Sequence, residues 1–595
     1  MNDFLGMTAR IVRAVGRAVA RAIGSSPPPA ATAVVFALTS SLAAQPVLHV
    51  SALAAGGGNG LSWGTAFSDL QDAINAASGS GGGFHQIWVA QGTYRPDGGS
   101  GDRAIAFALH DGLSLYGGFE GDESSLSQRD PAQNPTILCG DIGIAGDPAD
   151  NSLHVVTLNA FFSSAHIDGF TIRHGRADGA MFPANSGGGI LSQGSITVRG
   201  CLFTTNRAVA GGGIHSRMGS AVLESCVFQA NSATNEGGGA QINGAGTVKG
   251  CTFSGNNAPF GAGLHMCCSA STVRDCAFAS NFGNLGGGLY VPNGSVTVSG
   301  CTFTSNGAWR GGGAYVLGTG SHVVSCFFGL NSAGRGGALY LGNPVTVSNC
   351  VVSRNFATES GAGVLIAGSA SLLSTTVVNN SAVTFGGGVF MESGTVTAAN
   401  SIFWTNADGS GTGQGAQFMR ATGTLDMRHC CLQGWPGALS GPGSTGANPL
   451  LTSPLGADGL PGTPDDDVRL LPGSPCIDAG ENASLPSDGA DLDDDLDKAE
   501  TVPLDYYGSP RRVNDPFSAD TGVGASPITD MGASEAYPDV PADANQDGRV
   551  DFDDIIEILA NWGGECVPCD ADGNGEVGFG DITEVLAAWG IDLFG

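Results

Sequence analysis

The sequence predicts an all-β protein in which short strands wind into a solenoid of stacked coils. A block of about 25 residues repeats at least nine times between residues 186 and 406, and each copy carries a glycine triplet, an apolar pair and then C-x-F-x-x-N. Within a copy such as 294–307, apolar and small polar residues alternate with period two, while glycines interrupt any helix. So fixed a period is typical of parallel coils that stack about 4.8 Å apart.

Residues 1–44 have the pattern of a signal peptide. Arginines at positions 10, 13, 17 and 21 precede a mostly apolar run over 31–44. This run is too short to span a bilayer, and Ser41-Leu42-Ala43 supplies small residues for a cleavage site. An uncleaved anchor is the alternative. We therefore expect a secreted or cell-surface protein with no transmembrane segment in the mature chain.

Residues 45–150 are expected to form an N-terminal cap and the first coils. Phe67, Leu70, Ile74 and Ala77 have helical spacing, which predicts a short amphipathic helix. Such a helix would cover the open end of the solenoid, where an unpaired coil would otherwise be a sheet edge. The first strand and turn are expected over 86–97.

Residues 151–432 are expected to form the repeated coils, whose equivalent side chains stack as ladders. Thr375 and Ser401 continue the cysteine ladder, so that column needs small side chains and not disulfides. The pairs Cys267-Cys268 and Cys430-Cys431 lie off the ladder and are expected to be oxidised. The ladders are Phe203, Phe228, Phe253, Phe278, Phe303 and Phe328; Asn206, Asn231, Asn256, Asn281, Asn306 and Asn331; and Cys201, Cys226, Cys251, Cys276, Cys301, Cys326 and Cys350.

A further column follows the apolar residue of each glycine motif, and period-two alternation points it away from the core. Its aromatic members could stack against sugar rings, which predicts a ligand-binding stripe. The alternative is that these rings pack on one another or under a turn. The candidate ligand-binding residues are His215, His265, Tyr290, Tyr315 and Tyr340.

Catalysis is the weaker hypothesis, and no catalytic residue is assigned. A lyase or glycosidase needs carboxylates, and a lyase also a base, clustered across adjacent coils. Acidic residues between 187 and 400 are few and scattered in repeat phase. The best remaining cluster, which also fits an ordinary strand, is Asp168, Arg173, His174, Arg176 and Asp178.

Residues 433–540 are expected to form a C-terminal cap and acidic region. Residues 456–595 contain 32 acidic and 5 basic side chains, so they carry −27 of the net charge of −30. This balance argues against a nucleic-acid partner. The five aspartates within 491–497 could bind calcium weakly, and the alternative is a solvated acidic surface.

Residues 541–595 contain two 12-residue loops, 543–554 and 570–581, and an amphipathic segment follows each loop. Side-chain oxygens at loop positions 1, 3, 5 and 12, with glycine at position 6, suit a calcium ion. Arg549 and Glu576 would contribute carbonyl oxygens, and Asp551 would act through water. The predicted ligands are Asp543, Asn545, Asp547, Arg549, Asp551 and Asp554, then Asp570, Asp572, Asn574, Glu576 and Asp581.

Two resemblances add to these predictions. The motifs GGGI, GGGA and GGGL, with FTTN, FQAN and FSGN, resemble the repeats of polymorphic outer-membrane-protein adhesins over about residues 150–410. That family, like the pectin-lyase-like proteins, implies a right-handed parallel β-helix. The paired loop-helix units resemble a type I dockerin over about 541–591, which implies calcium and a cohesin-like partner. Phe552-Asp553 and Phe579-Gly580 depart from the small hydroxyl residues usual at loop positions 10 and 11.

Together these features predict an exported, non-catalytic right-handed parallel β-helix with a small α-helical, dockerin-like calcium-binding module over 541–595. We expect a surface or scaffold protein, adhesin-like, that binds a polysaccharide or cell-surface glycan. Two alternatives remain open: a polysaccharide lyase or glycoside hydrolase, and a purely structural envelope component.

Overall fold

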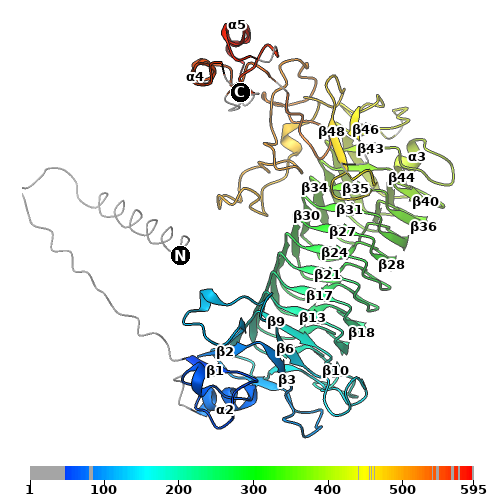
Figure 1. Ribbon diagram of the computed structural model, residues 1–595. Coiled ribbons are helices and arrows are strands. Elements are labelled where there is room, and N and C mark those ends of the chain that lie inside the picture. Colours follow the sequence, from blue (N-terminus) through cyan, green and yellow to red (C-terminus); the bar gives the residue numbers. More distant parts are fainter. Residues whose placement is uncertain are drawn as a thin grey trace, which may run out of the picture. The chain divides into compact units, whose positions relative to one another are not determined.

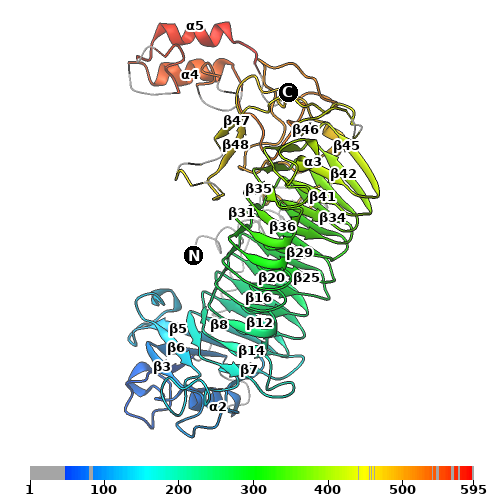
Figure 2. The same cartoon turned by 90° about the vertical axis from the view of Figure 1, so that its right-hand side faces the viewer.

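The structure is a computed structural model (Figures 1 and 2). It describes residues 47–79, 85–437, 439, 441–453, 456, 458–460, 462–538, 540–544, 549–563, 568–573 and 576–591. The predicted signal peptide lies outside these residues. Three long parallel sheets confirm the predicted solenoid, because successive strands of each sheet come from successive coils of the chain.

Sheet 1 has 14 strands and begins each coil. It starts at Val47, so the expectation of a first strand at 86–97 was one coil too late. The strands are β1 (Val47–Val50), β2 (Gln86–Ala90), β5 (Leu113–Phe119), β8 (Ser164–Asp168), β12 (Ser195–Arg199), β16 (Ser220–Glu224), β20 (Ala245–Lys249), β23 (Ser271–Arg274), β26 (Val296–Ser299), β30 (Ser321–Val324), β34 (Val345–Ser348), β38 (Ala370–Leu373), β42 (Thr395–Ala399) and β45 (Thr424–Arg428).

Sheet 2 has 13 strands and carries the phenylalanine ladder. The strands are β3 (Gly92–Tyr94), β6 (Thr136–Cys139), β9 (Phe170–Arg173), β13 (Leu202–Thr204), β17 (Val227–Gln229), β21 (Thr252–Ser254), β24 (Ala277–Ala279), β27 (Thr302–Thr304), β31 (Phe327–Gly329), β35 (Val351–Ser353), β39 (Thr376–Val378), β43 (Ile402–Trp404) and β46 (Cys431–Leu432).

Sheet 3 has 12 strands, and in the repeated coils each follows a glycine motif. The strands are β4 (Phe107–Leu109), β7 (Val156–Leu158), β11 (Ile190–Ser192), β15 (Ile214–Ser216), β19 (Ala240–Ile242), β22 (Leu264–Met266), β25 (Leu289–Val291), β29 (Ala314–Val316), β33 (Leu339–Leu341), β37 (Val364–Ile366), β41 (Val389–Met391) and β44 (Phe418–Arg420).

Shorter elements complete the fold. Two small parallel sheets lie between sheets 2 and 3 along the chain: β10 (Arg176–Ala177), β14 (Arg207–Ala210) and β18 (Ser232–Glu236), then β28 (Gly307–Arg310), β32 (Ser332–Arg335), β36 (Phe356–Ser360) and β40 (Ser381–Ala382). An antiparallel pair, β47 (Leu451–Ser453) and β48 (Asp467–Leu470), follows the coils. The helices are α2 (Leu70–Gly79), α3 (Gln414–Gln417), α4 (Phe552–Ala560) and α5 (Phe579–Ala587), with 3₁₀ turns η1 (Trp63–Thr65), η2 (Leu126–Gln128) and η3 (Asn482–Ser484).

The phenylalanine ladder is a stack of parallel rings in the core. From Phe203 to Phe328, neighbouring ring centroids are 4.6 to 4.9 Å apart, close to the spacing of paired strands. Each of these rings is fully buried. The regular 25-residue period therefore sets the same contact in every coil.

The asparagine ladder satisfies the backbone at a bend. In the middle of the stack, the Asn256 amide nitrogen donates to the Asn281 Oδ1 at 2.9 Å and to the Phe228 carbonyl at 2.9 Å. The Asn256 backbone N–H donates to the same Oδ1 at 3.1 Å. The preceding residue is left-handed, with φ +62° at Gly255, so the chain turns sharply there. Gln417 of α3 ends the ladder, because its Oε1 accepts from both nitrogens of Asn406.

The cysteine ladder is a column of buried free thiols, as predicted. The expectation for the pairs off the ladder was half wrong. Cys267 and Cys268 are bonded to each other, but Cys430 and Cys431 are both free and buried. Cys430 continues the ladder after Ser401, because Cys431 is paired with Ile402 in sheet 2. Its thiol therefore lies inside the core and not beside that of Cys431.

Both ends of the solenoid are covered. At the N-terminal end, α2 packs Leu70, Ala73, Ile74 and Ala77 into the core, as predicted. Phe67 lies outside the helix and bridges to Val50 of β1. At the other end, Trp435 and Leu439 pack against the core of the last coil.

The chain after residue 450 does more than close the end, because it returns along the outer face of sheet 2. Val468 and Ala533 pack on Phe327, Val351 and Val378, whose side chains face away from the core. At the centre of this cap, the Arg511 guanidinium is buried and lies 3.7 Å from the Glu535 carboxylate. Burial raises the pKa of Glu535.

We predict that Asn281→Ala lowers the free energy of unfolding by about 2–4 kcal/mol, because it leaves buried amide and carbonyl groups without partners. The measurement is urea unfolding of the mature chain, followed by far-UV circular dichroism. The matched control is Asn284→Ala in the same coil, an exposed position where the change should stay within about 0.5 kcal/mol. Equal effects of the two variants would contradict a stabilising role for the ladder.

Candidate functional site

The predicted binding stripe is a continuous row of side chains on the outer face of sheet 3. The middle residue of each strand points away from the core, and strand pairing places these residues directly above one another. We call this row the outer column. It comprises Ala108, Thr157, Leu191, His215, Gln241, His265, Tyr290, Tyr315, Tyr340, Leu365, Phe390 and Met419.

Although it faces outward, most of the outer column is covered. His215 and His265 are 5% and 4% exposed, and Tyr315 and Tyr340 are each 6% exposed. Two rows of residues flank it. One row precedes the glycine motifs and contains Glu236, Phe260, Leu285, Arg310 and Arg335. The other follows the sheet-3 strands and contains Arg217, Asn243, Cys267, Leu317 and Glu392.

The first half of the outer column is a polar cluster. Gln241 donates from Nε2 to the Glu236 carboxylate at 2.6 Å and to the Asn243 side-chain oxygen at 3.2 Å. His265 Nδ1 lies 3.2 Å from the same Glu236 oxygen, and Asn243 Nδ2 lies 3.3 Å from His215 Nε2. Five side chains from three successive coils thus form one connected group, in which Gln241 and His265 lie against the Glu236 carboxylate.

This cluster holds buried polar atoms that lack hydrogen-bond partners. They are Nδ1 of His215, Oε1 of Gln241 and both ring nitrogens of His265, of which Nδ1 is near the Glu236 carboxylate but makes no hydrogen bond to it. An unpaired buried polar group is unfavourable by about 1–3 kcal/mol, so such a set is typical of a site prepared for a ligand. Glu236, Asn243 and the neighbouring Tyr290 are half-exposed and reach solvent.

The surroundings of the cluster lower the pKa of His215 and that of Glu236, so that the histidine is neutral and the carboxylate is charged. Burial lowers the pKa of His215 to about 4, and Arg217 and His265 act in the same direction. His215 is therefore neutral at pH 7. The contact with His265 lowers the pKa of Glu236, which keeps this carboxylate charged.

The second half of the outer column is aromatic and packs on itself. The rings of Tyr315 and Tyr340 stack with centroids 4.5 Å apart, and Tyr290 lies 5.4 Å from Tyr315. The Arg310 guanidinium lies over the Tyr340 ring at 5.7 Å. Farther along, Arg335 and Glu392 form an ion pair of 2.9 Å that links the two flanking rows. Of the three tyrosines, only Tyr290 is half-exposed.

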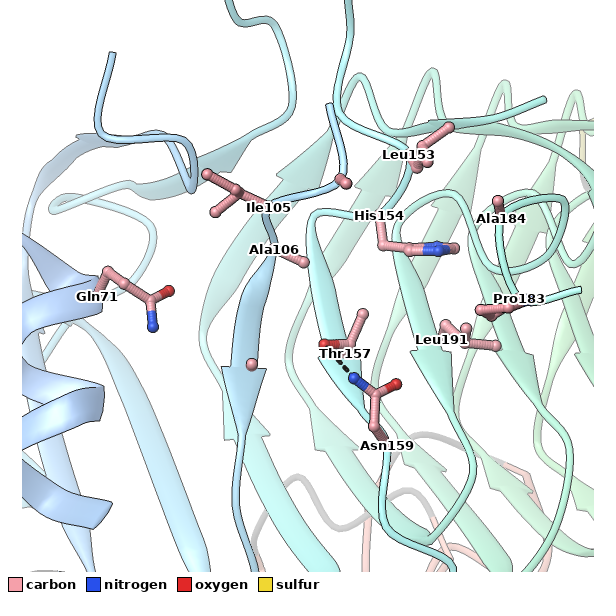
Figure 3. Close-up of a pocket in the computed structure, with 12 residues that line it drawn as sticks. Gln71, Ile105, Ala106, Leu153, His154, Thr157, Asn159, Pro183, Ala184 and Leu191 are labelled. Carbon is pink, nitrogen blue, oxygen red and sulfur yellow. Dashed lines mark hydrogen bonds between the residues drawn. The ribbon is translucent and has the colours of Figure 1, made fainter. Parts of the chain in front are cut away.

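A cavity of about 550 Å³ lies at the N-terminal end of the outer column. Figure 3 shows it between Gln71 of α2 on one side and Leu191 of β11 on the other. The hollow exists because the outer column begins with the small side chains Ala108 and Thr157. His154 lines it and is held by its Nδ1, which lies 3.0 Å from the Gly187 carbonyl oxygen.

The catalytic cluster considered from sequence is divided by the structure into separate groups. Asp168 pairs with Arg129 at 2.7 Å, on the outer face of sheet 1. Asp178 pairs with Arg103 at 2.7 Å and with Arg176 at 2.8 Å. Asp168 is therefore engaged by one arginine and Asp178 by two others. These residues do not assemble into one site.

Sequence reasoning missed Glu236, Gln241 and Asn243 as partners of the two histidines. Gln241 was visible as a member of the outer column, but its polar side chain was not weighed. Glu236 occupies the position just before a glycine triplet, where other coils carry Phe260, Leu285 or Arg310. Asking which residues neighbour the column in adjacent coils would have found it.

The two C-terminal loops have equivalent geometry in the residues that the structure describes. Asp554 and Asp581, at loop position 12, are both fully buried. Each accepts a hydrogen bond from the backbone N–H at position 9, Asp551 at 2.8 Å and Gly578 at 2.6 Å. Oxygen atoms of Asp570, Asp572 and Asp581 lie within 4.8 Å of one another. Three predicted ligands, Asn545, Asp547 and Asn574, lie outside the described residues.

The structure also places the other predicted ligands that it describes. The Asp551 side chain caps α4 by accepting from the Asp553 N–H at 2.9 Å. Asp543 is 8% exposed and lies at the start of its loop. Arg549 and Glu576 occupy position 7 of their loops, where only a carbonyl oxygen is required. Cys569, just before the second loop, is disulfide-bonded.

The two loop-helix units also pair with each other. The Val550 N–H donates to the Ile591 carbonyl at 2.8 Å, and the Gly563 N–H donates to the Val577 carbonyl at 2.9 Å. Val550 and Val577 are equivalent loop residues, and each is bonded to the residues that follow the other unit's helix. Figure 2 shows α4 and α5 side by side, and both contribute to one small core with Ile558 and Val585.

Comparison with known proteins agrees with the fold. Residues 155–328 and 268–432 match the family model of a right-handed β-helix region. No curated protein matches the chain. Within the part of the chain that the structure describes, no helix has both the length and the apolar character needed to cross a membrane. The family match and the three parallel sheets together identify the repeated coils as a right-handed parallel β-helix.

We predict that acidification destabilises the β-helix through His215. The pKa of this side chain is about 4 in the folded protein and 6.5 without burial, so the unfolded chain binds the proton more readily. Stability is therefore lost as the pH falls from 6.5 toward 4, by about 3 kcal/mol from this group. The measurement is urea unfolding of wild type and His215→Leu at pH 7 and pH 4.

The leucine variant should lose less stability on acidification than wild type, because Leu191 and Leu365 show that the outer column accepts this side chain. The control is His85→Leu, which removes a half-exposed histidine from the N-terminal cap. An unchanged pH dependence in His215→Leu would show that His215 does not carry the effect.

Proposed function

We propose that the protein is an exported β-helix scaffold, secreted or at the cell surface, that binds a polysaccharide or cell-surface glycan along the outer column. A calcium-dependent C-terminal module attaches it to a protein partner. The observation that carries the first proposal is the polar cluster, which joins unpaired buried polar atoms to the half-exposed Glu236 and Tyr290.

Sugar hydroxyl groups suit this region because each can donate one hydrogen bond and accept others. Glu236 can accept from a hydroxyl, and Tyr290 offers a ring face and a phenolic OH. Small movements of these two side chains would open Gln241 and His265 to the same ligand. The cavity beside Leu191 continues the outer column and gives room for a further part of the chain.

A non-catalytic role is favoured by the count of carboxylates. Glycoside hydrolysis uses a pair of them on either side of the bond that is cleaved. Among the described members of the polar cluster, Glu236 is the single carboxylate. A binding role needs no second one.

The second candidate is a polysaccharide lyase or glycoside hydrolase. It is favoured by the contact of 3.2 Å between His265 Nδ1 and the Glu236 carboxylate. A histidine oriented by a carboxylate is a common general base, and a lyase requires a base to remove a proton from the sugar ring. His265 would take that role.

We predict that the mature protein is retained on at least one polysaccharide of a panel of acidic and neutral polymers. The double variant Tyr290→Ala/Tyr315→Ala should weaken retention at least tenfold, because it removes the aromatic surface next to the polar cluster. The measurement is affinity electrophoresis in gels that contain each polymer. The control is Tyr116→Ala, which removes a tyrosine from the outer face of sheet 1.

The same panel distinguishes the two candidates when soluble products are analysed by mass spectrometry. Binding without released oligosaccharides supports the scaffold. Oligosaccharides that disappear in His265→Ala and Glu236→Gln would replace it with the enzyme. Retention that is equal in wild type and Tyr290→Ala/Tyr315→Ala would refute the outer column as the glycan site.

The C-terminal module is proposed to bind two calcium ions, one in each loop. The buried carboxylates of Asp554 and Asp581 and the convergence of Asp570 with Asp572 support this, because calcium takes six to eight oxygen ligands. Without a cation, acidic groups held this close repel one another. The ions would hold the first turn of each helix against its loop.

A cohesin-like protein partner is supported by the outer faces of the two helices. Phe552, Ile556, Leu559 and Trp562 are between 48% and 61% exposed. Phe579, Leu586 and Trp589 occupy equivalent positions in and just after α5 and are between 50% and 70% exposed. Large apolar side chains this exposed are typical of a protein interface. Phe552 and Phe579 stand at loop position 10, so the partner's surface would be apolar there.

We predict that Asp554→Asn and Asp581→Asn each remove one calcium ion from the full mature chain. The amide keeps the shape of the carboxylate but removes its charge, which is the main attraction for the ion. The measurement is isothermal titration of the calcium-free protein. The control is Asp553→Asn on the exposed side of α4. An unchanged calcium stoichiometry in both variants would overturn the proposed loop sites.

A further inference from the structure

A group of carboxylates comes together in the C-terminal cap, in a segment that precedes the two loops of the module in the chain. Oxygen atoms of Asp488, Asp493 and Glu500 lie within 4.8 Å of one another. A second group, Asp491, Asp493 and Asp495, meets the same criterion and shares Asp493. The segment 488–500 therefore holds two adjoining groups of three carboxylates, joined by Asp493.

The backbone explains how these residues come together. Ser487 and Thr501 form an antiparallel bridge, and the Asp488 N–H donates to the Glu500 carbonyl at 2.8 Å. The two ends of the segment are thereby held side by side. Between them, the Leu492 N–H donates to the Asp488 carboxylate, and an oxygen of the next residue, Asp493, lies within 4.8 Å of the carboxylates at both ends.

The decisive observation is that Asp488 is fully buried and its Oδ1 has no hydrogen-bond partner. Its other oxygen accepts from the Leu492 N–H at 2.8 Å. Glu500 likewise has a covered Oε1 without a partner. Two carboxylate oxygens are thus withdrawn from water in a place where a third carboxylate adds repulsion.

Basic side chains do not neutralise the group. Among the described residues, no ion pair involves Asp488, Asp493 or Glu500, and the Arg274 guanidinium pairs instead with Asp494 at 2.8 Å. The remaining repulsion is visible in the Asp488 pKa, which burial and the carboxylates of Asp493 and Asp491 raise. Lys498 belongs to the same segment and is exposed.

We propose that Asp488, Asp493 and Glu500 hold a calcium ion, and that Asp491 and Asp495, which converge on the shared Asp493, add negative charge beside it. All candidate donors are hard oxygen atoms, and nitrogen and sulfur ligands are lacking within both groups, which favours calcium over zinc. Calcium is favoured over magnesium because it accepts several carboxylates in irregular geometry. The ion would fix the segment 488–500, which Arg274 and Asp494 tie to sheet 1 of the β-helix.

The test separates this site from the two loops of the module. In the full mature chain, Asp554→Asn/Asp581→Asn serves as the background, and bound calcium is counted by equilibrium dialysis and atomic emission. One ion per chain should remain in the background, and Asp493→Asn/Glu500→Gln should remove it. The same pair of changes in the otherwise wild-type chain should also lower the count by one, whatever the loops of the module bind.

Trypsin gives a readout specific to this segment. Calcium should slow cleavage after Lys498 at least tenfold in the background protein and should give no protection after Asp493→Asn/Glu500→Gln. The matched control is Asp497→Asn, an exposed aspartate of the same segment outside both groups. Circular dichroism checks that each variant is folded, and Asp493→Asn alone, at an exposed position, provides a milder variant. The proposal is overturned if the background binds no calcium or if the variants keep both the ion and the protection.

Discussion

The buried asparagine ladder is the interaction on which the rest of this protein depends. Each coil must bend at the same residue if its strands are to pair with those of the coils above and below. The amide of each asparagine supplies that condition, because it accepts from one coil and donates to the next while also reaching a backbone carbonyl. A coil that bent one residue early would lose these bonds and would turn its apolar side chains outward.

The side chains on the outer faces of the sheets are aligned from coil to coil by the same strand pairing. The outer column exists because the glycine motif and the next strand follow five or six residues after the asparagine, and the sheet-3 strands then pair in register. His215 and Tyr315 are chemically different, yet they occupy the same place in their coils. The scaffold is therefore uniform inside, while its outer positions vary freely. This separation lets a repetitive sequence carry a local polar cluster without weakening the core.

The parts that repeat could be predicted from the sequence, and so could α2, whose helical spacing is a local signal. The contacts between a segment that occurs once and the coils could not. The 25-residue period gave the coils, the ladders and the members of the outer column. It did not reveal that the column is largely covered, because residues such as Glu236 and Arg335 belong to flanking rows that vary from coil to coil. Nor did it reveal the packing of Ala533 on Val351, since this contact joins a non-repeating segment to the face of a repeating sheet. The sequence also did not reveal that Val550 and Val577 each form a backbone hydrogen bond with the end of the other loop-helix unit.

The ladder also has a direction and an end. Every side-chain amide in it donates toward the C-terminal coil, and Gln417 receives the last of these bonds and turns its own nitrogen back to the carbonyls of Asn406 and Thr412. The stack thus ends at Gln417, because its amide nitrogen donates to backbone carbonyls and not to another side chain of the ladder. The coils between Asn206 and Asn256 precede those that the C-terminal cap contacts, so whole 25-residue units can be duplicated or lost there while both caps keep their contacts. Gene-level expansion and contraction by complete repeats can then adjust the reach of the protein. Single residues gained or lost at a bend are absorbed there, as in the asparagine spacings of 24 and 26 residues, whereas an insertion within a strand would turn the side chains that follow it to the opposite face.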